Sequence, residues 1–423
     1  MLKWLKCSIL ELLFGVFTLK KICVKLSMKK NSLTKKGRKE MNISNDIINI
    51  GVKDETLELF EGQYLLKNGV TYNSYLILDE KIAIIDSVDK RATKVWLQNI
   101  EKGVKGREPD YLVISHMEPD HSDSIQELVD KYPNIKLVGN QKTFAFLPQF
   151  FTIPDWEEKK LEIKENEELD LGEHHLKFLM APMVHWPEVM MEFEKTEGIL
   201  FSADAFGTFG VEEVKKDAWL EEARRYYANI VGKYGVQVQA VLKKVATLPV
   251  NMICPLHGPI LKEELEFYVQ KYNEWSQYQP EEEGILIACA SLHGYTLQAC
   301  QLLEKDLKEQ SKKVELIDLT KEDITRAVGE AFHYNTLVLA SSTYNAELVP
   351  CMDEFIRLLK AKGLQNRKIA YIENGTWAPM AGKWMKEGIM QMKNMESIEP
   401  VVTVRTKVKE EVAEKIRELS ERI

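Results

Sequence analysis

The chain has 423 residues, enough for two or three domains with a core in each. Its composition, 45% hydrophobic and 29% charged, is that of a globular protein. The net charge of −8 is uneven, because the first 40 residues carry eleven Lys or Arg against two Glu, which leaves a strongly acidic body. Such a body excludes nucleic acid as the main partner, since that affinity comes mostly from neutralising phosphates.

The first forty-four residues form a basic extension with two open interpretations. The apolar run Cys7–Leu19 is interrupted by Glu11 and is shorter than the roughly twenty residues of a membrane span. One interpretation is a disordered or non-native start, with Met41 as the true first residue. The other is a basic amphipathic helix on a membrane surface. A membrane-spanning protein is therefore not expected.

Short strands dominate the chain from residue 45 onward, and helices follow. Strands are predicted at Gln63–Lys67, Ser74–Leu78, Ile82–Asp86, Tyr111–Ser115, Lys136–Gly139, His175–Met180 and Gly198–Ser202. Helices are predicted at Thr93–Lys102, Ser122–Lys131, Trp219–Val231, Val236–Ala246 and Leu261–Gln277. This order indicates a sandwich of two sheets flanked by helices over residues 45–278.

A second domain is predicted after a Pro-containing acidic linker at residues 279–283. Residues 284–423 alternate regularly between apolar strands and amphipathic helices. The strands are predicted at Ile285–Ala290, Val314–Ile317, Thr336–Ala340, Lys368–Ile372 and Pro400–Val404. The helices are predicted at Tyr295–Glu309, Glu322–Ala331, Leu348–Ala361, Ala381–Glu387 and Lys409–Glu421. Five apolar strands with crossover helices indicate a doubly wound parallel sheet.

The most specific motif is His116-Met-Glu-Pro-Asp-His121, directly after a predicted strand. Three further segments place a metal-binding side chain just past a predicted strand, at His185, Asp204 and His257. Four of the eight histidines of the chain fall in this set, so chance is a poor explanation. Ligands gathered from several strand ends are what a rigid metal site requires.

The candidate ligands are four imidazoles and three carboxylates, which suit two metal ions that share one Asp. They are His116, Glu118, Asp120, His121, His185, Asp204 and His257. A carboxylate-rich set without thiolates favours iron or manganese over structural zinc. Zinc stays open, because metallohydrolases also use His and Asp.

The pattern HxExDH, followed by a distant His, Asp and His, resembles the metallo-β-lactamase-like fold in its flavodiiron version. Hydrolases of that superfamily usually carry HxHxDH, whereas this chain has Glu118 at the second position. Eighteen residues separate His185 from Asp204, as in the family. The resemblance implies one iron held by His116, Glu118 and His185, and a second held by Asp120, His121 and His257, with Asp204 bridging. Asp123 departs from the Gly that family members often carry.

The first strand–helix connection of the second domain, Ser291-Leu-His-Gly-Tyr-Thr296, resembles the phosphate loop of flavodoxins. Hydroxyl groups, a Gly and a helix N-terminus suit a phosphate. Two later loops after strands three and four complete a predicted FMN site at the carboxyl edge of the sheet. The predicted contacts are Ser291, His293, Gly294, Tyr295, Thr296, Ser342, Thr343, Tyr344, Asn345, Asn374, Gly375 and Trp377. Tyr344 and Trp377 are expected to flank the flavin ring.

The resemblance implies a fold of mixed α/β and α+β class: an N-terminal metallo-β-lactamase-like αββα sandwich and a C-terminal flavodoxin-like five-stranded doubly wound parallel sheet. It implies a flavodiiron oxidoreductase that reduces O2 to water, NO to N2O, or both, with electrons relayed by FMN. Phe206 and Phe209 are candidate walls of a gas pocket. The main alternative is a zinc metallohydrolase with a regulatory flavin-binding domain, and a further one is an electron carrier with a vestigial metal site.

The resemblance also implies a head-to-tail homodimer, or a dimer of dimers, that brings the FMN of one subunit to the irons of another. None of the six cysteines forms a CxxC pair, which excludes a rubredoxin module within this chain. An external electron donor such as rubredoxin is therefore expected. Scattered cysteines fit a reducing compartment, so a cytoplasmic location is predicted. The six are Cys7, Cys23, Cys254, Cys289, Cys300 and Cys351.

Overall fold

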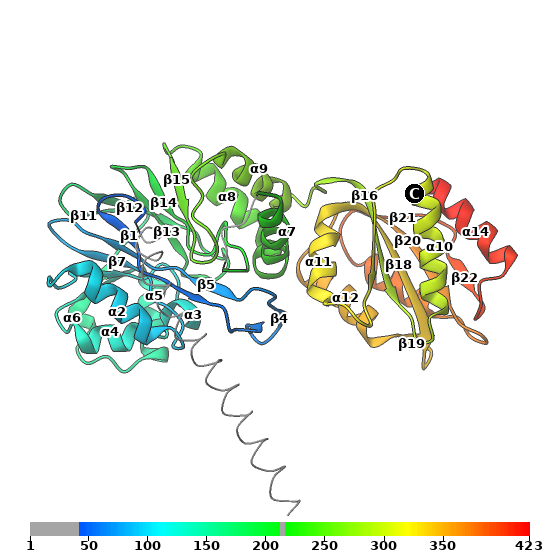
Figure 1. Cartoon of the computed structure of the whole chain (residues 1–423), viewed down its shortest axis with the longest axis horizontal. Coiled ribbons are helices and arrows are strands. Elements are labelled where there is room, and N and C mark those ends of the chain that lie inside the picture. The colour runs from blue at the N-terminus through cyan, green and yellow to red at the C-terminus, as the bar shows by residue number, and fades with distance from the viewer. Residues whose placement is uncertain (1–41, 212–215) are drawn as a thin grey trace, which may run out of the picture.

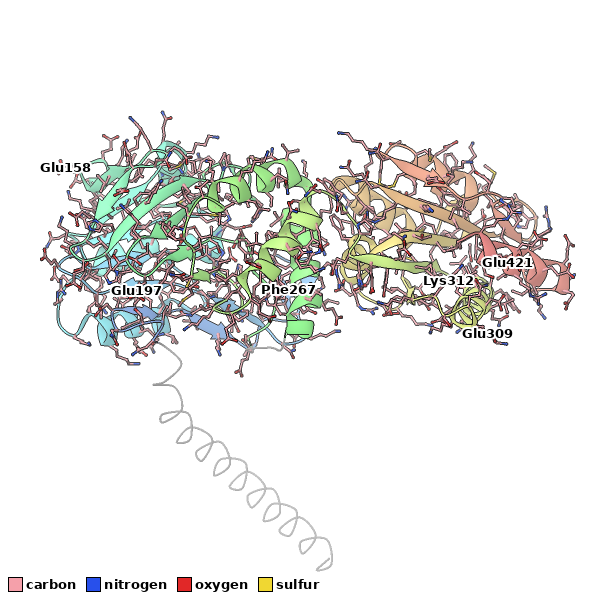
Figure 2. All side chains as sticks on the ribbon, turned by 90° about the horizontal axis from the view of Figure 1, so that it is seen from above. Glu158, Glu197, Phe267, Glu309, Lys312 and Glu421 are labelled. Carbon is pink, nitrogen blue, oxygen red and sulfur yellow. The ribbon has the colours of Figure 1, made fainter. Side chains whose placement is uncertain are left out.

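A computed structural model describes residues 42–211 and 216–423. Two domains lie side by side along the long axis of the molecule, and the chain passes between them once (Figure 1, Figure 2). The predicted N-terminal extension lies outside the described residues, apart from its last three positions. Within the part of the chain that the structure describes, no helix has the length and apolar character needed to cross a membrane.

The first sheet of the N-terminal domain has six strands in the order β1-β6-β7-β8-β9-β10. They are β1 (Ile47–Asn49), β6 (Tyr75–Ile77), β7 (Ala83–Ile85), β8 (Tyr111–Val113), β9 (Lys136–Gly139) and β10 (Lys160–Glu162). The strands from β7 to β10 run parallel, whereas β1 and β7 are antiparallel to β6. The parallel part places the carboxyl ends of β7 and β8 at one edge, where the metal motif begins.

The second sheet has five strands in the order β11-β12-β13-β14-β15. They are β11 (Glu168–Asp170), β12 (His175–Met180), β13 (Met190–Glu194), β14 (Ile199–Phe201) and β15 (Met252–Cys254). Alternate apolar side chains of both sheets meet in a dry interlayer core that includes Ile85, Val113, Phe178 and Phe201. Every one of these four side chains is at most 1% exposed, so the core fixes the two sheets relative to each other.

Helices cover the outer faces of both sheets and complete the αββα sandwich (Figure 1). Those on the first sheet are α2 (Thr93–Val104), α3 (Pro119–Ser122), α4 (Ile125–Lys131), α5 (Gln141–Phe150) and α6 (Trp156–Lys159). Those on the second are α7 (Lys216–Tyr226), the π-helical turn η1 (Tyr227–Val231), the short η2 (Gly232–Tyr234), α8 (Gly235–Val245) and α9 (Leu265–Ser276). These helices pack on the sheets through an apolar face. In α2, for example, Trp96 and Ile100 lie one turn apart and are both fully buried.

Two small antiparallel ribbons extend the N-terminal domain toward the C-terminal domain of the same chain. One pairs β2 (Val52–Asp54) with β5 (Val70–Tyr72), and the other pairs β3 (Leu59–Phe60) with β4 (Tyr64–Leu65). In the second ribbon Phe60 and Tyr64 are buried, whereas Leu59 and Leu65 are 42% and 55% exposed. We call residues 59–65 the cover hairpin, because its buried face packs toward His257, a predicted metal ligand.

The C-terminal domain is a parallel sheet in the order β17-β16-β18-β20-β21. Its strands are β16 (Glu282–Ala290), β17 (Val314–Asp318), β18 (Tyr334–Tyr344), β20 (Arg367–Asn374) and β21 (Met395–Ser397), with β19 (Glu347–Leu348) on β18 and β22 (Val402–Val404) on β20. The helices are α10 (Tyr295–Glu309), α11 (Ile324–His333), α12 (Pro350–Ala361), α13 (Ala381–Ile389) and α14 (Glu410–Arg422). This is the flavodoxin-like strand order with its ligand edge at the carboxyl ends.

The prediction of the fold class is confirmed, and the differences are local. The sheet has seven strands where five were expected, because β21 and β22 pair in succession with β20 and the short β19 pairs with β18. The helix expected at Trp219–Val231 changes from α to π after Tyr226. Strand β16 begins at Glu282, inside the predicted linker, and the domain boundaries remain a prediction.

Candidate metal and flavin sites

The predicted metal-binding side chains lie on loops at one edge of the sandwich, each just beyond a strand. His116 to His121 follow β8, His185 follows β12, Asp204 follows β14 and His257 follows β15. Ala203 and Phe206, which flank Asp204, have φ angles of 49° and 66°, a left-handed conformation that is uncommon for residues other than Gly. Such conformations persist where the surrounding structure holds them, and they often mark functional sites.

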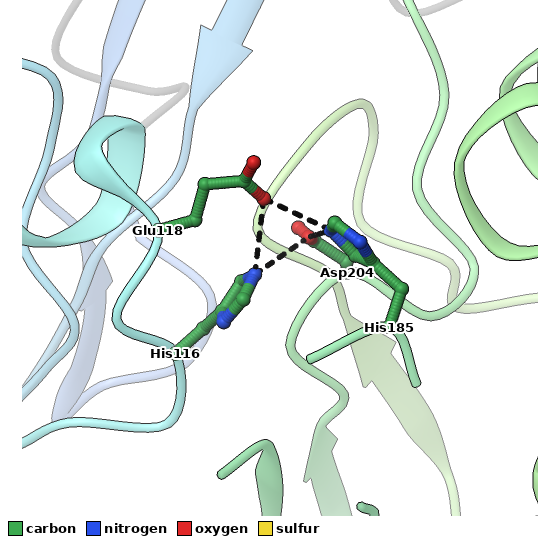
Figure 3. A group of neighbouring side chains, drawn as sticks. All are labelled: His116, Glu118, His185 and Asp204. Atoms are coloured by element: carbon green, nitrogen blue, oxygen red, sulfur yellow. Dashed lines mark hydrogen bonds and ion pairs between the residues drawn. The ribbon is translucent and has the colours of Figure 1, made fainter. Parts of the chain in front are cut away.

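The first ligand group consists of His116, Glu118, His185 and Asp204, whose side chains point toward one another (Figure 3). Oε2 of Glu118 lies 3.2 Å from Nε2 of His116 and 2.9 Å from Nε2 of His185. Oδ2 of Asp204 lies 3.4 Å and 3.2 Å from the same two nitrogens. Four donor atoms thus surround one point.

The second group consists of Asp120, His121 and His257, and it uses the other oxygen of Asp204. Oδ1 of Asp204 lies 3.1 Å from Nε2 of His121 and 3.6 Å from Nε2 of His257. Oδ2 of Asp120 lies 3.1 Å from Nε2 of His257. The two oxygens of Asp204 therefore face different groups, which is the arrangement that a carboxylate bridging two ions requires.

The donor atoms fit metal ions because several of them are buried without a hydrogen-bond partner. Nε2 of His121, His185 and His257, both oxygens of Asp120 and Oδ1 of Asp204 are in this state. Buried polar atoms without partners are costly, so their convergence indicates that something else satisfies them. The structure brings together all seven ligands predicted from the sequence.

Glu188 supports the first group and was missed by the sequence analysis. Its Oε1 accepts hydrogen bonds from Nδ1 of His116 at 2.8 Å and from the backbone N–H of Met117 at 2.9 Å, and Glu188 is 1% exposed. A carboxylate on the far nitrogen of a ligand imidazole fixes the tautomer and orientation of the ring. The only available signal was position, three residues beyond His185 in a Pro-containing loop.

Further hydrogen bonds fix the backbone at the start of the motif and the ring of His257. Oδ1 of the buried Asp86 accepts from the N–H groups of Ser115 and His116 at 2.8 Å and 3.2 Å. Nδ1 of His257 lies 2.6 Å from the carbonyl oxygen of Thr71, to which it donates when Nε2 binds a metal. Asp123, the departure from the family pattern, turns to Lys90, whose Nζ is 3.9 Å from Oδ2.

The charges of the ligands compensate one another when no metal is bound. Burial acts to lower the pKa of His185 and His257, yet neighbouring carboxylates raise these pKa values to about 9 and about 8. Burial acts to raise the pKa of Asp204, but His121, His116 and His185 hold it well below its usual range. A metal must displace the protons from these imidazoles, so metal binding is expected to release protons.

Aromatic rings enclose the second ligand group. The ring of His257 makes an edge contact with Phe60 at 5.3 Å between centroids and also contacts Tyr226 at 5.8 Å. Phe209, a predicted wall of the gas pocket, packs on Phe60 at 5.6 Å. Phe206 instead stacks on Tyr272 at 4.3 Å. The structure thus separates the two phenylalanines that the sequence analysis grouped together, and whether either lines a gas pocket stays a prediction.

A cleft at the carboxyl edge of the C-terminal sheet gathers most of the residues predicted to bind the flavin. Among the predicted residues, its lining includes His293, Tyr295, Thr296, Ser342, Thr343, Asn345, Asn374, Gly375 and Trp377. Ser291, Gly294 and Tyr344 are not in the lining, although they lie next to it in sequence. The sequence analysis missed Leu292, Ala346, Thr376, Ala378 and Thr406. Thr406 comes from the loop after β22, which only the folded sheet brings to this edge.

The cleft has features that suit a phosphate and an aromatic ring. Oγ of Ser291 is buried without a hydrogen-bond partner in the loop that leads into α10. Gly294 has a φ of 83° at the N-cap of that helix, where a side chain would be strained. Trp377 is 85% exposed and Tyr344 is 46% exposed, although large aromatic side chains usually lose most of their contact with water.

Comparisons with known proteins agree with this site. The family described as "ODP family beta lactamase" matches residues 70–258. An anaerobic nitric oxide reductase flavorubredoxin of Aliivibrio fischeri is 30% identical over 73% of this chain and 64% of its own length, so this chain spans somewhat less than two thirds of that relative.

Solved structures share the fold over both domains of the chain. The rubredoxin:oxygen oxidoreductase of Desulfovibrio gigas has a TM-score of 0.85 at 24% identity and covers 90% of this chain and 97% of its own. The flavodiiron protein of Giardia intestinalis has a TM-score of 0.80 at 22% identity, with 90% and 96% covered.

The fold and the site define a two-domain protein in which a β-lactamase-like domain with a candidate two-metal site precedes a flavodoxin-like domain. The chain shares the fold of flavodiiron proteins over about nine tenths of its length. These relationships support the oxidoreductase interpretation over a zinc metallohydrolase.

Proposed function

We propose that this protein is a flavodiiron oxidoreductase that reduces O2 to water, NO to N2O, or both. The observation that carries the proposal is the division of seven converging donor residues into two groups that share the two oxygens of Asp204. One metal would be held by His116, Glu118 and His185, and the other by Asp120, His121 and His257. Asp204 would bridge them.

Iron is the metal that this donor set favours. Three carboxylates and four imidazoles without a thiolate suit iron or manganese better than structural zinc. Glu118 contributes a carboxylate at the position where hydrolases of this fold usually have an imidazole, and it lies between His116 and His185. The extra negative charge stabilises a more highly charged metal pair.

FMN is the flavin that the cleft favours, with its phosphate at the loop from Ser291 to Thr296 and its ring near Trp377. FMN would supply single electrons, and a pair of irons would supply adjacent open positions for a diatomic gas. The protein's own part is to hold the ligands in place and to shape the pocket. Glu188 keeps the ring of His116 oriented, and Asp86 fixes the backbone that carries it.

Protons must also reach the site. The reduction of one O2 to two waters consumes four electrons and four protons, and the reduction of two NO to N2O and water consumes two of each. The side chains of Glu118, Asp120 and His185 are 15%, 12% and 11% exposed, whereas those of His116 and His121 are fully buried. Solvent therefore approaches the site from the side of Glu118, Asp120 and His185.

Assembly as a head-to-tail homodimer, or as a dimer of such dimers, would bring the two cofactors together, because they lie in different domains of one chain (Figure 1). Exposed apolar side chains lie beside both sites. Leu59 and Leu65 are on the cover hairpin, and Leu292 and Trp377 are at the flavin cleft. Grouped exposed apolar residues mark interaction surfaces. A second copy of this chain is the partner that buries both groups at once.

An external donor, rubredoxin or a protein like it, would deliver the electrons by a transient contact. The described chain contributes the free cysteines Cys254, Cys289, Cys300 and Cys351, of which the first three are buried. No CxxC spacing in the whole sequence could provide an internal rubredoxin module. A cytoplasmic location, predicted from the same cysteines, remains part of this proposal.

The proposal is tested by metal analysis and by gas consumption. Protein purified without added metal should contain about two irons and one FMN per chain, and the reduced protein should consume O2 or NO catalytically. Parallel measurements with the two gases rank the substrates. Two zinc ions and no iron would favour the hydrolase alternative. Flavin reoxidation without sustained gas consumption would indicate an electron carrier instead.

A further inference from the structure

Arg225, in the last turn of α7, connects the C-terminal domain to the cover hairpin. Its Nη2 donates to the carbonyl oxygen of Leu65 at 2.6 Å and to Oδ2 of Asp323 at 2.8 Å, and its Nε donates to Oγ1 of Thr325 at 3.2 Å. Leu65 belongs to β4, whereas Asp323 and Thr325 begin α11 of the other domain. Arg225 is only 5% exposed, so these bonds are shielded from water.

A second path leads from Arg225 toward the metal ligands through aromatic rings. The guanidinium carbon of Arg225 lies 5.0 Å from the ring centroid of Phe209. Phe209 packs on Phe60 at 5.6 Å, and Phe60 makes an edge contact with His257 at 5.3 Å. Phe60 is itself part of the cover hairpin. The two paths therefore converge on the segment that covers the second ligand group.

The surrounding structure fixes Arg225 closely. Asp323 caps α11 by accepting from the N–H of Thr325, which orients both partners of the arginine. A Cβ atom added to Gly329 of α11 would stand 3.2 Å from Cα of Arg225, so the two helices touch at this point. Figure 1 shows α7 and α11 facing each other between the domains, with β4 beside α7.

We propose that Arg225 is a positioning residue that uses the C-terminal domain to hold the cover hairpin, and with it Phe60 and Phe209, against the metal pocket. The proposal deepens the proposed function and rests on it for the identity of the pocket. Arg225 reaches the Leu65 carbonyl and Asp323 through Nη2 and Thr325 through Nε, so two nitrogens of one planar fork hold the three acceptors. Lysine presents a single nitrogen on a flexible stem, so it would hold the same acceptors less rigidly.

The neighbouring Arg224 provides a matched control. It is 4% exposed and also links the two domains, since Nη1 donates to Glu330 at 2.9 Å and Nε donates to Glu281 at 2.5 Å. The acceptors of Arg224 are Glu281 in the predicted linker and Glu330 in α11, and neither belongs to the cover hairpin. Replacement of either arginine weakens the domain contact, but only replacement of Arg225 releases the hairpin.

The decisive experiment compares Arg225→Ala, Arg225→Lys and Arg224→Ala in the full-length, metal-loaded protein. Hydrogen exchange is measured at two amides: the N–H of Gln63 within the cover hairpin, which donates to Phe60, and the N–H of Leu66 at its base, which donates to Glu58. Arg225→Ala should accelerate exchange of these amides about tenfold or more, and Arg225→Lys should do so by a smaller factor, because hydrogen bonds to a charged donor are lost or reduced in number. Arg224→Ala should leave them within about twofold of wild type.

A second readout is the rate at which a ferrous chelator removes iron from each variant. Arg225→Ala should release iron several-fold faster than Arg224→Ala, because the hairpin no longer covers His257. Equal exchange and equal iron release in the two alanine variants would overturn the proposal. A wild-type protein that binds no iron would refute the proposed function, whereas the amide comparison would still decide whether Arg225 holds the hairpin.

Discussion

Glu188 offers the sharpest test of how the pocket holds its metals. Replacement by Ala removes the acceptor of two buried donors, Nδ1 of His116 and the N–H of Met117. Each buried donor left without a partner costs about 1–3 kcal/mol. Loss of such a support for a metal ligand usually lowers metal affinity about tenfold to a hundredfold. Glu188→Gln keeps one acceptor without its charge and should lie between wild type and Glu188→Ala.

Glu192 is the matched control for this substitution. It is fully buried, and it accepts from Oγ of Ser115 at 3.0 Å without touching a ligand. Burial raises the pKa of Glu192 well above its usual value, which favours the neutral carboxyl, and Glu192→Gln keeps the shape of that neutral side chain. We expect this variant to bind iron within about threefold of wild type, a difference below ~1 kcal/mol.

The assay is competition with a chelator of known affinity, followed by metal analysis of the protein. The expected order of iron affinity is wild type and Glu192→Gln first, then Glu188→Gln, then Glu188→Ala. Wild-type affinity in Glu188→Ala, or an equal loss in Glu192→Gln, would refute the role assigned to Glu188.

Three further predictions follow from single contacts. Asp204→Asn should reduce the metal content from two ions per chain to below one, and retention of both ions would contradict a bridging role. Trp377→Ala should raise the Kd for FMN roughly threefold to tenfold in a fluorescence titration if the ring stacks on the flavin; an unchanged Kd would exclude this contact. The hydrogen bond to Glu194 raises the pKa of His174 above its ordinary 6.5, and His174 in turn holds the pKa of Glu194 below 4.5 against the effect of burial. The pair therefore stabilises most between about pH 4.5 and 6.5; stabilisation is lost as the pH rises through the raised pKa of His174 and as it falls through the lowered pKa of Glu194. The unfolding free energy lost in His174→Gln should accordingly be larger at pH 5.5 than at pH 9, and a loss that does not vary with pH would contradict the assignment.

The sequence by itself identified the seven candidate ligands that the structure brings together, because most of their signal is local. His116 to His121 lie within one motif, and His185 and Asp204 each come shortly after a strand predicted from its apolar residues. The alternation of strands and helices after residue 284 was equally readable, since each element is specified by its own pattern of apolar residues. Short strands such as β13 escaped prediction, because three to five buried residues carry too little periodicity.

Only the tertiary structure decided which groups surround those ligands. Glu188 is 72 residues from His116, and Arg225 is 160 residues from the Leu65 carbonyl that it binds. The assignment of one oxygen of Asp204 to each ligand group likewise depends on how two sheets pack. Contacts of this kind arise from packing between distant segments, and no local pattern of residue types encodes them.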